Sequence, residues 1–305
     1  MNKAMLAAIH MLSYPEIDIR KTYPLERELK KLMAHRHKNP ALCRIWERAV
    51  PCGTHEVPVR IFTPIEVTRP FILLFFHGGG WVLGDIDSYD GVCRDMAVTT
   101  GCIVASADYR LAPEHPFPAA PEDCYAVAKA LFQNCGVFGV DPSDIVLIGD
   151  SAGGNLAASV SLMARDRGEF LPGRQILIYP STGNDHSDTS PYPSIRENGT
   201  GYLLTSKRIC DYLDMYRTSD DDLLNPYFAP LMAGDFSNQP DTLLITAQYC
   251  PLRDEGEAYG QKLLEAGGRV EVHRMENALH GYFTLPVRFE LVKKTYALIN
   301  HFLEE

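Results

Sequence analysis

The sequence lacks C-x-x-C pairs, a surplus of basic residues, and any apolar run of the roughly 18 residues that a membrane-spanning helix requires. Its 305 residues carry a formal net charge of −10, which disfavours phosphate-rich partners such as nucleic acids and anionic membranes. The 8 cysteines are scattered, as is typical of free thiols in a reducing compartment. The short segment Ala4–Leu12 has no signal-peptide cleavage site. We therefore expect a cytoplasmic protein with neither a nucleic-acid nor a membrane partner.

The chain instead contains short strand-like segments that alternate with segments of helical length. Apolar residues make up 46% of it and charged residues 22%, which is an ordinary globular composition. The alternation predicts an α/β fold with a mostly parallel sheet flanked by helices. The expected strands are Val57–Thr63, Phe71–Phe76, Cys102–Ala107, Ile145–Gly149, Gln175–Tyr179, Thr242–Ala247 and Arg269–His273, and the expected helices are Ser88–Thr100, Ala119–Cys135, Ala152–Asp166, Glu255–Ala266 and Val287–Leu303. Phe71–Phe76 and Ile145–Gly149 are apolar on both faces, so we expect them in the middle of the sheet.

Two regions do not follow this alternation. Residues 1–48 show helical spacing of apolar side chains without a strand, and residues 183–225 form a polar segment rich in Ser, Thr, Asp and Gly. Long insertions beside a compact sheet are usually functional lids. We therefore interpret both regions as parts of one helical cap, over a core made of residues 49–182 and 226–305.

A predicted strand-to-helix turn carries the first chemical motif. The segment Gly149-Asp150-Ser151-Ala152-Gly153 matches G-x-S-x-G between a buried strand and an apolar helix. Glycines beside the serine allow a strained turn that pushes the hydroxyl out of the sheet, where a base can reach it. The N-terminus of the following helix favours the negative charge that develops during attack on a carbonyl. We predict Ser151 as a nucleophile; the alternative is a glycine-rich turn with an incidental serine.

A run of glycines follows an expected central strand, in the segment His77-Gly78-Gly79-Gly80-Trp81. Glycines leave their backbone N–H groups unshielded, so these groups can converge with the N–H of Ala152 on a substrate oxyanion. The run therefore predicts an oxyanion hole. We interpret His77 as a residue that fixes this loop by hydrogen bonding, and Trp81 as packing at the pocket edge.

The candidate base is His280, which follows the last expected strand in the segment Asn277–Tyr282. A histidine on such a loop can accept the proton of Ser151 and later donate it to the leaving alcohol. Of the 10 histidines, only this one has the position expected in the chain order nucleophile, acid, base. The alternative is a solvated loop histidine.

With these motifs the chain resembles the hormone-sensitive-lipase-like esterases of the α/β-hydrolase superfamily, from about Ile61 to the C-terminus. The resemblance rests on four segments, namely His77–Trp81, Asp108–Ala120, Gly149–Leu156 and His280-Gly281. It implies an eight-stranded hydrolase core with a helical cap, carboxylesterase activity on short- to medium-chain acyl esters, and neither a cofactor nor a metal. It also implies that the oxyanion donors are Gly79, Gly80 and Ala152, and it allows a homodimer.

The chain departs from this family at the acid of the catalytic triad. Family members carry an aspartate at the start of an Asp-Pro-Leu-x-Asp segment, where this chain reads Cys250-Pro251-Leu252-Arg253-Asp254. A thiol is a weak hydrogen-bond partner and, unless ionised, brings no negative charge to the histidine. Loss of the triad acid costs about four orders of magnitude in kcat in other serine hydrolases.

Three alternatives follow from the cysteine at this position. Asp254 can replace the acid, although Asp254 and Glu257 also have the spacing of a capping box for the helix that follows. Ser151 and His280 can act as a weakened dyad, because the oxyanion hole still supplies part of the rate. In the third alternative the protein is impaired or inactive as a hydrolase and binds a small apolar ligand. Retention of the serine and the histidine favours a serine carboxylesterase that acts on small-molecule esters.

Overall fold

The computed structural model describes residues 18–34 and 43–305, so the predicted segment Ala4–Leu12 lies outside the described residues. The strands are β1 (Cys43–Cys52), β2 (His55–Pro64), β3 (Ile72–Phe76), β4 (Ile103–Ala107), β5 (Ile145–Asp150), β6 (Arg174–Ile178), β7 (Asp241–Tyr249) and β8 (Val270–Leu279). The α-helices are α2 (Ile19–Ala34), α3 (Asp90–Thr100), α4 (Ala119–Asn134), α5 (Ala152–Arg167), α6 (Pro193–Asn198), α7 (Ser206–Tyr216), α8 (Arg253–Glu265) and α9 (Glu290–Glu304). In the parts of the chain that the structure describes, no helix is both long enough and apolar enough to cross a membrane.

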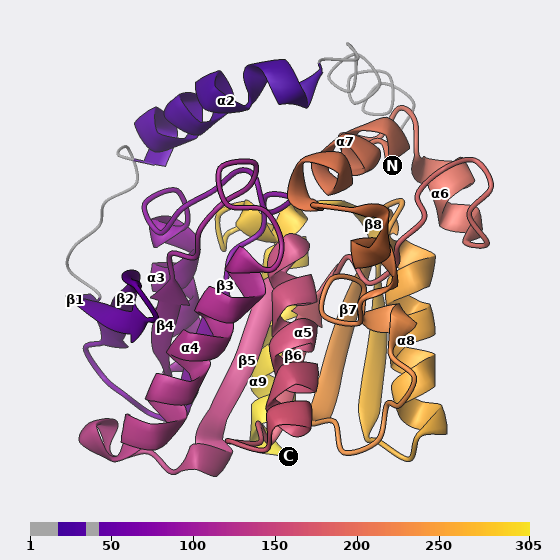
Figure 1. Cartoon of the computed structure of the whole chain (residues 1–305). Coiled ribbons are helices and arrows are strands. Elements are labelled where there is room, and N and C mark those ends of the chain that lie inside the picture. The colour runs from indigo at the N-terminus through magenta and orange to yellow at the C-terminus, as the bar shows by residue number, and fades with distance from the viewer. Residues whose placement is uncertain (1–17, 35–42) are drawn as a thin grey trace.

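The strands form one 8-stranded sheet in the order β1-β2-β4-β3-β5-β6-β7-β8 (Figure 1). The pairs β1–β2 and β2–β4 are antiparallel, and the remaining neighbours are parallel. Every residue of β3 and β5 is buried, as expected for parallel strands that helices cover on both faces. The predicted α/β-hydrolase fold, with these two strands in the middle of the sheet, is confirmed.

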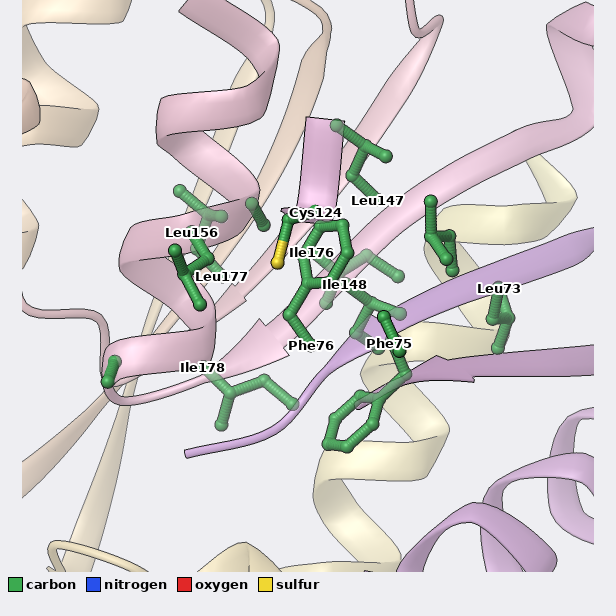
Figure 2. Packing of buried hydrophobic residues seen from close by; sticks show 14 of the residues in the cluster. Leu73, Phe75, Phe76, Cys124, Leu147, Ile148, Leu156, Ile176, Leu177 and Ile178 are labelled. Carbon is green, nitrogen blue, oxygen red and sulfur yellow. The ribbon is translucent and has the colours of Figure 1, made fainter. Parts of the chain in front are cut away.

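Helices cover both faces of the sheet. In Figure 1, α4 and α5 pack together over one face, and α3 and α9 pack together over the other. Figure 2 shows Cys124 of α4 and Leu156 of α5 among side chains of the central strands, including Ile148 and Leu177. Fully burying each large aliphatic or aromatic side chain contributes about 1.5–3 kcal/mol, so this core holds the carboxyl ends of the strands in fixed positions.

The end of the N-terminal region differs from the sequence prediction. We expected residues 1–48 to contain no strand, but β1 begins at Cys43 and pairs with β2 along its whole length. The strand lies at the edge of the sheet and most of its residues are partly or fully exposed. It therefore lacks the apolar alternation that marks a strand in the sequence. The core begins at β1, before residue 49.

The two regions that we interpret as one cap are in contact. Helix α2, from the N-terminal region, packs against α7, from the segment 183–225 (Figure 1). Arg208 of α7 forms an ion pair with Glu26 of α2 at 2.5 Å. Side chains of both helices line the same cavity as Ser151, so the two segments cover the carboxyl end of β5 together.

Candidate active site

Ser151 lies at the turn between β5 and α5, where the sequence predicts it. Its φ of 56° and ψ of −118° are rare for a residue with a Cβ atom, and such a conformation persists only where the surrounding structure fixes it. The N–H of Ser151 donates to the carbonyl of Ile178 at 2.9 Å, which holds the turn against the end of β6. The serine side chain consequently faces a cavity above the sheet.

Gly149 and Gly153 are required by close backbone packing around this turn. A Cβ atom at Gly149 would lie 2.2 Å from the carbonyl oxygen of Gly153, and one at Gly153 would lie 1.9 Å from that of Phe76. Both distances are far below van der Waals contact, so no larger residue fits at either position without moving the backbone. The G-x-S-x-G spacing thus lets the N-terminus of α5 approach β3 and brings the N–H of Ala152 next to the serine.

The glycine run after β3 lies against the same cavity. Gly79 and Gly80 have φ values of 127° and 62°, which favour glycine. An added Cβ at Gly79 would lie 2.1 Å from the carbonyl oxygen of Leu83, and one at Gly80 would lie 2.5 Å from the ring of Tyr212. Both glycines line the cavity together with Ser151 and Ala152. The three positions predicted to supply oxyanion donors are therefore gathered around the serine.

Asp150, which the sequence prediction left without a role, holds the glycine loop. Its carboxylate accepts the N–H of Gly78 at 2.8 Å and the hydroxyls of Tyr89 at 3.2 Å and Tyr179 at 3.5 Å. Burial raises the pKa of Asp150 to about 6, although the Gly78 N–H lowers it. A charged residue at the end of a strand that is otherwise entirely apolar was the signal in the sequence that could have identified this position.

His77 lies at the start of the glycine loop and contacts it, in agreement with our interpretation of the sequence. Its Nδ1 atom is 2.9 Å from the carbonyl oxygen of Gly78, and its ring stacks on that of Tyr109 with 4.3 Å between centroids. The Tyr109 hydroxyl donates to the His77 carbonyl at 2.7 Å. Burial lowers the pKa of His77 to about 4, so its ring is neutral near pH 7. These contacts are those of a residue that fixes the loop.

His280 comes directly after β8 and points its ring at the serine. Its Nε2 atom lies 2.9 Å from Oγ of Ser151, within hydrogen-bond distance. The adjacent Gly281 has a φ of 82°, which turns the chain sharply at this point. Although part of the residue is exposed to solvent, both ring nitrogens face protein atoms, and burial lowers the pKa of His280 to about 3. The imidazole is therefore a neutral base near pH 7.

Cys250 occupies the position behind the histidine. It follows β7, it is fully buried, and its Sγ atom lies 3.1 Å from Nδ1 of His280. Burial raises the pKa of the Cys250 thiol well above its ordinary value, so the group is neutral. For the Ser151 hydroxyl to donate to Nε2, the proton of the neutral imidazole must be on Nδ1, and the sulfur is then its acceptor. A neutral sulfur orients this ring but supplies no negative charge.

The structure does not bring Asp254, the candidate replacement acid, into contact with the histidine. The carboxylate of Asp254 accepts the N–H of Ser194 at 2.7 Å and pairs with Arg253 at 2.7 Å, whereas both ring nitrogens of His280 have other partners. Asp254 is the second residue of α8, and its carboxylate lies against Ser194 and not against His280.

The predicted capping box is wrong. Helix α8 already begins at Arg253, and its N-cap residue, Leu252, makes no side-chain hydrogen bond. The carboxylate of Glu257 instead accepts the hydroxyl of Thr246 at 2.9 Å and binds Arg274. Ser194 and Arg274, which bind Asp254 and Glu257 respectively, are distant from them in sequence, so the local spacing did not indicate these contacts.

Glu255 anchors the start of the segment 183–225 to α8. Its buried carboxylate accepts the N–H groups of Thr182 at 2.8 Å and Gly183 at 3.1 Å, and lies 2.7 Å from Nε2 of His186. The segment therefore leaves the core at a fixed point, beside the loop that carries Cys250.

The cavity above Ser151 has a volume of about 190 Å³. Its apolar lining comes mainly from the cap and the loop before α8, through Leu204, Ile209, Tyr212 and Leu252. Its polar lining includes Lys30 of α2, a second residue that the sequence prediction missed. The chemistry available here is nucleophilic attack by a serine on a small carbonyl compound.

The arrangement of nucleophile after β5, base after β8 and glycine loop after β3 defines the serine hydrolases of the α/β-hydrolase fold. The sequence profile described as alpha/beta hydrolase fold matches residues 73–284.

Proteins of known activity are similar over most of the chain. An arylesterase of Saccharolobus solfataricus is 39% identical over 76% of this chain and 74% of the relative. Esterase LipI of Mycobacterium tuberculosis is 43% identical over 78% of this chain and 75% of the relative. The solved structure of a hyperthermophilic esterase from the archaeon Pyrobaculum calidifontis superposes with a TM-score of 0.89, at 35% identity, over 100% of this chain and 98% of that one. The chain belongs to the hormone-sensitive-lipase-like carboxylesterase family of the α/β hydrolases, a family of carboxylic ester hydrolases.

Proposed function

We propose that this protein is a serine carboxylesterase that hydrolyses short- to medium-chain acyl esters through an acyl-enzyme on Ser151. The observation that carries the proposal is the 2.9 Å contact between Nε2 of His280 and Oγ of Ser151, beside a loop of glycines. A nucleophile and a base at this distance are ready for proton transfer without rearrangement.

The reaction proceeds in two similar halves. The Ser151 hydroxyl gives its proton to Nε2 of His280 while Oγ attacks the ester carbonyl carbon, and the carbonyl oxygen takes up the negative charge. The N–H groups of Gly79, Gly80 and Ala152 stabilise this oxyanion. His280 then donates the proton to the departing alcohol, which leaves an acyl group on Oγ. In the second half, water gives a proton to His280 and attacks the acyl group on Oγ of Ser151. The carboxylic acid leaves, and the proton returns to Oγ.

The size of the cavity supports short acyl groups. A volume of about 190 Å³ lies below the roughly 300–1,000 Å³ typical of sites for drug-sized ligands. Its apolar walls suit an alkyl chain, and a medium-length chain has to extend past the cap residues.

Cys250 weakens this enzyme in our proposal. A triad carboxylate stabilises the imidazolium that forms in the transition state, and a neutral buried thiol does not. The 3.1 Å contact preserves the orientation of the ring, so hydrolysis still occurs. Because the negative charge is missing, we expect this hydrolysis to be slow. The missing negative charge favours the second candidate, a catalytically impaired hydrolase-fold protein that binds a small apolar ligand.

Replacement of Ser151 by alanine tests the proposal. Turnover of p-nitrophenyl acetate and butyrate should disappear in Ser151→Ala, and turnover that is unchanged would contradict the mechanism. An active-site organophosphonate separates the two candidates: rapid stoichiometric labelling of Ser151 indicates an enzyme, whereas an inert serine together with tight binding of an apolar ligand indicates a binding protein.

We also propose a cytoplasmic location and, as the family resemblance allows, a homodimer. The 8 cysteines are free and most of them are buried, which supports a reducing compartment. Cell fractionation tests the location, and sedimentation equilibrium tests the oligomeric state.

A further inference from the structure

Helix α2 brings a lysine into the cavity that contains the serine and the histidine. Lys30 lines this cavity together with Ser151 and His280, although more than 100 residues separate it from either. It also lines a larger neighbouring cavity of about 580 Å³ that contains neither of them. Its side chain therefore forms part of the wall between the reaction centre and the outside.

The position of this lysine is set by its neighbours on α2. Glu26 pairs with Arg208 at 2.5 Å, and Arg27 donates to the carbonyls of Val82 and Ala112, each at 2.7 Å. Residues three and four apart share one face of a helix, so the face that carries these two anchors also carries Lys30. The helix is thus fixed with this face toward the core.

The ammonium group of Lys30 has no ion-pair or hydrogen-bond partner among the residues that the structure describes. Burial lowers the pKa of Lys30, and the negative charge of Asp150 raises it. Asp150 lies beyond ion-pair distance of the lysine, and its oxygens already accept the N–H of Gly78 and the hydroxyls of Tyr89 and Tyr179. A partly buried charge without a partner is costly, and a bound anion would offset that cost.

None of the other charges that act on Lys30 forms an ion pair with it. Arg208 and Glu26 pair with each other, and Asp85, which lines the larger cavity as Lys30 does, lies beyond ion-pair distance of the lysine. Within the lining of the reaction cavity, as far as the structure describes it, Lys30 is the one lysine or arginine. An anionic group on a ligand of Ser151 would therefore meet this ammonium group and no other cation.

We propose that Lys30 selects esters that carry a carboxylate within a few bonds of the ester carbonyl. This inference rests on the proposed function and names its substrate class: half esters of short dicarboxylic acids, or acyl esters of short hydroxy acids. In both, the carboxylate pairs with the Lys30 ammonium while the ester carbonyl lies at Ser151. The small cavity favours chains of this length.

Matched pairs of esters test the proposal. Monoethyl succinate and ethyl butyrate differ by a carboxylate on the acyl side, and 3-acetoxypropanoate and propyl acetate differ by one on the alcohol side. We expect kcat/KM to favour the charged member of at least one pair, which identifies the side that faces Lys30. In Lys30→Met this preference should fall about tenfold, the magnitude of one charge-assisted hydrogen bond. Lys30→Arg should retain the preference.

Lys31→Met is the matched control, because Lys31 lies on the same helix and does not line the reaction cavity. It should leave the preference unchanged. If Lys30→Met lowers kcat/KM equally for charged and neutral esters, the lysine only balances the charge of Asp150 and the proposal is overturned. A preference that does not change in Lys30→Met overturns it as well.

A second measurement tests the role of Lys30 without requiring fast turnover of an ester. Succinate should protect Ser151 from organophosphonate labelling better than butyrate does, and Lys30→Met should abolish the difference. Equal protection in the unmutated protein would contradict the proposal. The proposed function is tested by a different variant. It is contradicted if Ser151→Ala retains full turnover of ethyl butyrate.

Discussion

The Sγ atom of Cys250 lies 3.1 Å from Nδ1 of His280, where a serine hydrolase has the negative charge of its acid. The contact preserves the orientation of the imidazole, and the second ring nitrogen is 2.9 Å from Oγ of Ser151. The site therefore has the geometry of a triad with the electrostatics of a dyad. The first three predictions follow from this difference.

Restoring a carboxylate should accelerate the reaction. In Cys250→Asp, a negative charge would stabilise the imidazolium, and we expect kcat for a p-nitrophenyl ester to rise by about 10²- to 10⁴-fold. Cys250→Ser, which is also neutral, serves as the control and should show no such gain. A Cys250→Asp protein that is folded but no faster would show that the missing charge does not limit the rate.

Asp254→Asn should leave turnover within about twofold of the unmutated rate, because the carboxylate binds Ser194 and Arg253 and has no contact with the imidazole. Loss of the partly buried ion pair should lower the free energy of unfolding by about 1 kcal/mol. Urea denaturation and steady-state kinetics measure the two effects. A collapse of kcat would instead identify Asp254 as the catalytic acid.

The pH at which kcat/KM falls on the acid side should reflect the absence of a triad carboxylate. His280 acts as a base only when neutral, and burial lowers its pKa to about 3, so activity should persist well below pH 6.5 and fall as pH drops through the folded pKa. In Cys250→Asp the carboxylate favours the imidazolium, which raises the pKa of His280 and moves the acid limb to higher pH. An acid limb at the same pH in both proteins would argue against this account.

Removal of the carboxylate beside the nucleophile should damage both stability and rate. Asp150→Ala leaves the N–H of Gly78 and the hydroxyls of Tyr89 and Tyr179 without their acceptor. We expect a loss of about 2–4 kcal/mol in the free energy of unfolding and of about 10²-fold in kcat, because the oxyanion loop loses its anchor. Asp150→Asn keeps an oxygen for Gly78 and should be milder; an equally large loss would point to the charge itself.

A methyl group on the oxyanion loop should interfere with the cap. The Cβ atom in Gly80→Ala would lie 2.5 Å from the ring of Tyr212, and φ at this position is 62°. We expect kcat to fall by about 10²-fold or more as the loop shifts away from the oxyanion. Gly91→Ala is the control, because a Cβ atom there has no neighbour within 4 Å and the residue lies in α3. Wild-type kcat in Gly80→Ala would contradict the assigned role of the loop.

Local patterns in the sequence determined the central strands, the strand-to-helix turn at Ser151, and the position of His280 directly after the last strand. These features depend on residues that are neighbours along the chain, such as the apolar run before Gly149, so their physical causes can be identified without coordinates. The sequence prediction missed the edge strand β1 because its partly exposed residues lack the apolar alternation by which a strand is recognised in a sequence.

Tertiary structure alone decided which side chains meet across the site. The sequence identified Cys250 as a departure from the family, but only the fold determined that its sulfur contacts His280 while Asp254 turns toward Ser194. The approach of Lys30 to the serine likewise depends on the packing of α2 against α7. Such contacts join residues far apart in the chain, and their distances follow from how helices and loops pack, which residue type and spacing do not specify.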